Sequence, residues 1–184
     1  MKPNPETLVQ AKLVAEESAR FNLRVVVGRR ELKRSINTPM MVIRYIRPQN
    51  QTRSAFKSEG VKTIGGVKAL QVKFTEQGIP RLIKSENDAP AVGRIWIDPA
   101  TGRILKGELG FESKLPQEVT VKASVNVEFG LAPKLDIWVP LSMEETCALT
   151  VYGITVTSVG KATYANFRQF SVNVSDFIKK DGGR

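Results

Sequence analysis

The segments Val119-Thr-Val-Lys-Ala-Ser-Val-Asn-Val-Glu-Phe129 and Leu135-Asp-Ile-Trp-Val-Pro-Leu-Ser-Met-Glu144 carry an apolar side chain at every odd position. Successive side chains of an extended chain point to opposite faces, so each segment predicts a strand with one apolar face. The intervening residues 130–134, Gly-Leu-Ala-Pro-Lys, are typical of a turn. The stretch therefore predicts a long antiparallel hairpin with one dry and one solvated face. Arms of roughly 34–37 Å exceed the usual strand length and favour a large, curved sheet.

The residues on either side of this hairpin predict further antiparallel strands. Two turns define them best. Gly65-Gly66 fits a two-residue hairpin, and Asp98-Pro-Ala-Thr-Gly102 fits a type I turn closed by a glycine bulge. The expected strands are 52–64, 70–74, a short one at 81–84 within the loop 77–90, 94–97, 103–111, 150–157 and 161–174, the last two joined by Ser158-Val-Gly160.

The N-terminal part of the chain predicts helices. Residues 4–21 have an apolar stripe at helical spacing, with Asn4 as the cap and Pro5 in the first turn. Residues 24–28 fit a short strand or a buried connection equally well, and 29–35 suggest a short basic helix. Residues 40–46 form a further expected helix, which Arg47-Pro48 ends.

These elements together predict an α+β fold, in which N-terminal helices pack on one large, curved, mostly antiparallel meander sheet. We expect this sheet to form an open half-barrel. The whole chain, 1–184, is expected to be one domain, with a helical cover at 1–47, the sheet at 48–175 and a frayed tail at 176–184.

The composition limits the partners. The formal net charge of +10 favours anionic partners such as lipid headgroups, lipopolysaccharide or nucleic acid, although it also serves solubility alone. The basic residues are scattered, which argues against a nucleic-acid footprint. No apolar run approaches the roughly 20 residues of a membrane-spanning helix, and the first residues lack the apolar core of a signal peptide. The single cysteine, Cys147, excludes an intrachain disulfide.

The chain contains no histidine, which excludes Ser-His-Asp and Cys-His catalysis and the common structural zinc sites. Two carboxylate groupings remain. Glu144 and Glu145 are neighbours on an expected strand, so their side chains point to opposite faces. Glu86 and Asp88 lie in a loop rich in turn-forming residues. Neither grouping suits catalysis by paired carboxylates. We therefore expect a protein that is not an enzyme and that needs no cofactor or metal.

Two groups of residues are candidates for binding. An apolar pocket between helix and sheet would be lined by Met40, Met41, Ile43, Val121, Val125, Ile137 and Leu141, unless helix and sheet simply pack together. Trp96 and Trp138 have the parity of the polar face and are candidates for a partner surface. The alternatives for the tryptophans are a second covering layer, a subunit contact or cross-strand pairing.

Several segments resemble a family of uncharacterised bacterial exported proteins. They are 15–22, 36–39, 48–53, 93–105, 138–145 and 162–172, which include Gly93-Arg-Ile-Trp-Ile-Asp-Pro-Ala-Thr-Gly102. The resemblance implies a periplasmic or cell-envelope location, but no reaction and no functional residues. Members of the family usually carry a signal peptide and further strands before the first helix, so this chain is expected to be the C-terminal part of a longer protein.

The expected architecture is also similar to the lipoprotein-carrier (LolA/LolB-like) fold, in which acyl chains lie between sheet and helices. This similarity implies a non-enzymatic envelope protein that binds a lipid or another amphiphile between the concave sheet and the helices. The alternative is a structural or protein-interaction module with a filled core and a basic face. Such a module would meet a protein partner, or a second copy, through a sheet edge.

Overall fold

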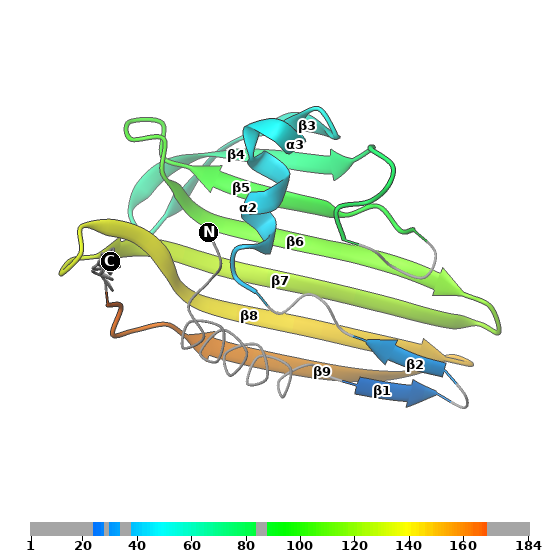
Figure 1. Ribbon diagram of the computed structural model, residues 1–184. Helices are drawn as coiled ribbons and strands as arrows, with labels where there is room; N and C mark the ends of the chain where they lie inside the picture. The colour runs from blue at the N-terminus through cyan, green and yellow to red at the C-terminus, as the bar shows by residue number, and fades with distance from the viewer. Residues whose placement is uncertain (1–23, 28–29, 34–37, 84–87, 169–184) are drawn as a thin grey trace, which may run out of the picture.

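The main element of the computed structural model is one seven-stranded antiparallel sheet (Figure 1). The structure describes residues 24–27, 30–33, 38–83 and 88–168. Each strand of the sheet pairs with the next strand in the chain, which confirms the predicted meander. The strands are β3 (Ser54–Ile64), β4 (Val67–Glu76), β5 (Val92–Ile97), β6 (Ile104–Leu115), β7 (Val119–Ala132), β8 (Ile137–Val151) and β9 (Ile154–Thr163).

The described part of the chain is mostly β rather than α+β, and its sheet is neither closed nor strongly curled. The predicted half-barrel is therefore wrong in its curvature. Two short helices are described, α2 (Met41–Ile46) and α3 (Pro48–Gln51), of which α2 confirms the predicted helix at 40–46. The predicted helix at 4–21 and the tail at 176–184 lie outside the described residues.

A separate two-stranded sheet precedes α2. It pairs β1 (Arg24–Val27) with β2 (Arg30–Lys33) in antiparallel register, with Val25 paired to Leu32. Of the two possibilities left open for 24–28, the structure shows the strand, at Arg24–Val27, whereas the basic helix predicted at 29–35 is wrong at Arg30–Lys33. A segment of four residues is too short for its apolar positions to show whether they repeat with the period of a helix or of a strand. Its pairing with the neighbouring strand therefore decides its conformation.

The two predicted turns are confirmed. Gly65 and Gly66 both have positive φ, 53° and 84°, as the mirror-image hairpin turns require. In the Asp98–Gly102 turn, the Gly102 amide donates to the Asp98 carbonyl at 2.8 Å, and Gly102 has a φ of 69°. The Thr101 hydroxyl and the Ala100 amide donate to the Asp98 carboxylate and hold its pKa below the ordinary value.

Two finer sequence predictions are wrong. The last hairpin turns at Tyr152-Gly153, not at 158–160, which lie inside β9. Gly160 faces Glu145, and a Cβ at this glycine would overlap the Glu145 side chain, so it allows a close approach rather than a turn. Residues 81–83 form no strand. The buried Glu76 carboxylate holds this loop by accepting from the amides of Leu82 and Ala91 at 2.7 and 3.1 Å.

The hydrophobic core lies between α2 and one face of the sheet, here called the core face. Val42 and Tyr45 of α2 are fully buried on this face, and the Tyr45 ring stacks on Phe74 with 5.1 Å between ring centroids. The helix reaches β6 closely at Gly107, where a Cβ would lie 2.7 Å from Val42 Cγ1. Figure 1 shows α2 across the middle strands, so it covers part of the core face and leaves the outer part of β8 and β9 without cover from α2.

We predict that Gly93→Ala destabilises the protein by about 1–3 kcal/mol, because the new Cβ would overlap the Phe74 ring and the Glu108 carbonyl oxygen. Gly110→Ala is the matched control on the neighbouring strand, since its nearest neighbour would be the Ala123 carbonyl oxygen at 3.3 Å. Urea unfolding of both variants checks the difference. Equal midpoints would contradict the packing of Phe74 described above.

Candidate functional site

The residues predicted to line a pocket at the helix form part of a packed interface. Met40 is exposed beside α2, whereas Met41 and Ile43 are half-buried and pack against the core. Val125 of β7 is fully buried on the core face. Val42 and Tyr45 thus fill the space between α2 and the sheet, as the interpretation of simple helix–sheet packing expects.

A β-bulge separates the other predicted pocket residues from these. Glu128 pairs with Ser142 but Phe129 pairs with Pro140, so β8 carries one extra residue, Leu141. Directly paired residues share a face, so the parity of β8 reverses at this point. Ile137 therefore faces away from Val125, and it is exposed, as is Leu141. Val121 keeps the core-face parity and is half-buried. A proline within a strand often marks a bulge, and Pro140 is the sequence signal for this one.

The two tryptophans do not form the predicted exposed surface, and this prediction is corrected for both. Because of the bulge, Trp138 lies on the core side, where it packs against the core and donates its indole N–H to the Ile104 carbonyl at 2.7 Å. The Arg103 guanidinium lies 5.1 Å from the centre of its ring. Trp96 does lie on the opposite face, paired with Gln71 and Lys106, but it is buried, with the Lys106 ammonium 4.9 Å from its ring centre.

An apolar pocket opens where the β7–β8 turn meets the segment that follows β9. We call it the end pocket, and its volume is about 520 Å³, within the usual range of small-molecule sites. The hydrogen bond from the Tyr164 amide to the Leu141 carbonyl, 2.8 Å long, joins its two walls. The Tyr164 hydroxyl also reaches the Met143 sulfur at 3.7 Å. The pocket is lined by residues 131–135, Leu141 and residues 164–168.

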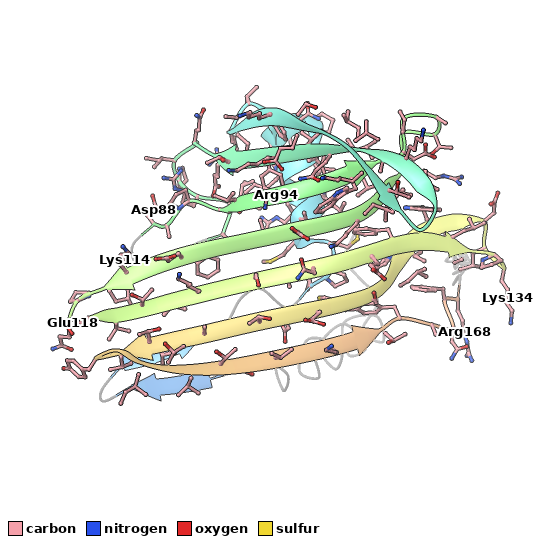
Figure 2. The ribbon with its side chains drawn as sticks, turned by 180° about the vertical axis from the view of Figure 1, so that it is seen from behind. Asp88, Arg94, Lys114, Glu118, Lys134 and Arg168 are labelled. Carbon is pink, nitrogen blue, oxygen red and sulfur yellow. The ribbon has the colours of Figure 1, made fainter. Side chains whose placement is uncertain are left out.

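The mouth of the end pocket is positively charged. Lys134 and Arg168 are both exposed lining residues. Figure 2 shows them at the same end of the sheet, opposite the end that carries Lys114 and Glu118. Within the described ranges, neither cation forms an ion pair with a carboxylate. An apolar cavity with two unneutralised cations at its mouth can hold an acyl chain or ring system and an anionic group at once.

Sequence reasoning found only Leu141 of this pocket. Residues 130–134 were interpreted as a turn and 161–174 as a continuous strand, whereas β9 ends at Thr163 and residues 164–168 leave the sheet. The periodicity of the sequence cannot predict that a hairpin turn contacts a chain segment about thirty residues later. The register of β8 against β9 does so, since it places Ser142 beside Thr163.

The face opposite the core face carries several ion pairs. Its ion pairs link Arg94 to Glu59 at 2.8 Å, Lys106 to Glu108 at 2.9 Å, Lys122 to Glu112 at 3.1 Å and Lys161 to Glu144 at 2.9 Å. The Arg94 guanidinium and the Gln71 amide lower the pKa of Glu59. The pairing of Glu144 with Lys161, while Glu145 faces Val125, confirms that these two glutamates point to opposite faces. Asp88 lies 3.8 Å from Arg81; Glu86 is outside the described residues.

Comparison of the chain with protein-family models, curated proteins and solved structures finds no match in any of the three. The resemblance to exported proteins therefore stays a prediction. In the part of the chain that the structure describes, no helix has the length and apolar character to cross a membrane. The same residues contain no group of three or more acidic, cysteine or histidine side chains placed to hold a metal ion.

We predict that Tyr45→Phe reduces the loss of stability at alkaline pH. Burial first, and the Glu76 carboxylate second, raise the pKa of Tyr45 above its ordinary value of 10.0. Above pH 10 the unfolded chain releases a proton that the folded protein keeps, so stability falls as the pH rises. Unfolding midpoints in urea at several pH values from about 8 to 11 check this. Tyr152→Phe, at an exposed turn residue, is the control and should leave the profile unchanged.

Proposed function

We propose that the protein is a non-enzymatic binding protein for an anionic amphiphile, and that the end pocket is its binding site. The observation that carries the proposal is the combination, in one cavity of about 520 Å³, of an apolar lining with the cations Lys134 and Arg168, which form no ion pair among the described residues. The apolar part of the ligand lies against Leu131, Leu135 and Phe167. Its anionic group lies at the mouth, within reach of the ammonium and guanidinium groups.

Two further observations support a ligand of this class. Leu131 and Leu141, which line the pocket, are large apolar side chains more than a third exposed, and a bound apolar chain would remove them from water. Four cations of the opposite sheet face, Arg94, Lys106, Lys122 and Lys161, are paired with carboxylates, which reduces their attraction for an anion relative to Lys134 and Arg168. The resemblance to exported proteins adds a location to the proposal, which is the periplasm or cell envelope.

A second candidate function is a structural or protein-interaction module without a small-molecule ligand. The packing of Val42 and Tyr45 favours it, because these side chains fill the space in which a lipoprotein-carrier fold would hold its acyl chain. The two candidates differ in what the end pocket does, and one binding experiment separates them.

The experiment is titration with a fatty acid that carries an environment-sensitive fluorophore, alongside the methyl ester of the same probe. We expect the acid to bind with a blue-shifted emission and the ester to bind at least about tenfold more weakly, because the ester lacks the charge that Lys134 and Arg168 neutralise. The double variant Lys134→Glu/Arg168→Glu should remove this preference. Leu131→Asp, which places a carboxylate against the apolar chain, should weaken binding of both probes.

Lys114→Glu is the matched control, since Lys114 is an exposed lysine at the opposite end of the sheet (Figure 2). It changes the net charge in the same direction and should leave the preference for the acid intact. Equal losses in Lys114→Glu and in a Lys134→Glu single variant would show general charge attraction and contradict the site. No binding of either probe by the folded wild-type protein would favour the interaction module.

A further inference from the structure

The two edge strands of the seven-stranded sheet differ in how well they are protected against pairing with another chain. β3 forms one edge, and its register shifts between Ser58 and Val61, where Gly60 has a φ of 89°. It also carries Lys57, Glu59 and Lys62. A bulge and charged side chains are the usual protection of an edge strand against pairing with another chain.

β9 forms the other edge and has none of this protection over its described length. It pairs with β8 over ten residues without a register shift, it contains no proline, and its one charged residue is Lys161. Ile154, Val156 and Val159 are 73%, 67% and 54% exposed. A long, regular edge strand rich in β-branched residues is a template for a further strand.

One hydrogen bond shows which backbone groups of β9 point away from the sheet and are free to pair with another strand. The Tyr164 amide donates to the Leu141 carbonyl, so residues of even number in β9 direct their N–H and C=O groups towards β8. The odd residues Thr155, Thr157, Val159 and Lys161 therefore direct theirs outward, away from the sheet. Exposed donors and acceptors in this regular row can bond to a second strand without any change in the fold.

We propose that β9 pairs antiparallel with β9 of a second copy of this chain, about a two-fold axis near Ser158, to form a dimer with a continuous sheet. In this register, residues paired across the axis have numbers of equal parity. Core-face residues therefore meet core-face residues, and polar residues meet polar residues, so both faces of the sheet continue into the second copy. The exposed Val156 then lies opposite Gly160 of the partner subunit, beside the Glu145 side chain that covers this glycine.

The charges allow this pairing. Lys161 lies opposite Thr155 of the partner subunit rather than opposite the partner's Lys161, and its own ammonium is already 2.9 Å from Glu144. A two-fold axis uses the same edge twice, so the interface closes at two copies. Pairing of β9 with the β3 edge of another copy would instead grow an open chain, and the bulge at Gly60 disfavours it. The inference does not depend on the end pocket or its ligand.

The test is sedimentation velocity of the full chain from about 1 μM to about 1 mM. We expect a monomer–dimer equilibrium that Thr157→Pro weakens at least about tenfold, because proline removes an outward N–H while the hydrogen bonds of β9 to β8 remain. Val159→Lys should weaken the dimer as well, since it places a charge at the interface. Circular dichroism of each variant shows whether the sheet has formed.

Val61→Lys is the matched control, because it makes the same substitution at a valine that is 61% exposed on the opposite edge. It should leave the dimer unchanged. A wild-type protein that stays monomeric up to the highest concentration would overturn the proposal. So would species larger than a dimer, or a dimer that Thr157→Pro and Val159→Lys leave intact while both variants keep the sheet.

Discussion

The single extra residue in β8 determines which side chains of this strand face the core and which face away from it. As long as β7 and β8 run in register, one apolar row faces the core and one polar row faces solvent. At Leu141 that order reverses, so Trp138 is brought to the core side while Ile137 turns away. The end pocket lies beside this bulge, and Leu141 is one of its lining residues.

The core and the pocket are consequently different environments within one hairpin. Under α2, close packing depends on Gly107 and Gly93, which leave room for Val42 and Phe74, so the described side chains fill this region. Beyond the bulge, the walls are half-exposed and come from two chain segments held together by a few contacts. The charges follow the same division. Carboxylates pair with Lys106, Lys122 and Lys161 of the opposite sheet face, whereas Lys134 and Arg168 have no such partner among the described residues.

The sequence predicted the strands well because their period, length and turn residues are local properties. The Gly65-Gly66 and Asp98–Gly102 turns are correct for that reason. Predictions from local sequence patterns were wrong where contacts with a strand distant in the sequence determine the conformation. Glycine is typical of turns, but Gly160 lies inside β9. Because it has no side chain, it leaves room for Glu145 on the neighbouring strand. The parity of Trp138 and Ile137 depends on a bulge, for which Pro140 is the only local sign. The end pocket joins a turn to a segment about thirty residues later, and no local pattern contains that contact.

The meander also determines the order in which the sheet can assemble. All six pairings of the large sheet join strands that follow one another in the chain, so each requires the closure of a short loop, with the loop between β4 and β5 as the longest. Local pairings of this kind favour fast folding, because each loop closes at a small entropic cost. During synthesis, β3 and β4 can pair before β8 and β9 have been made. The strand with the exposed edge, β9, is then the last to join, and until it joins, β8 is the open edge of the sheet.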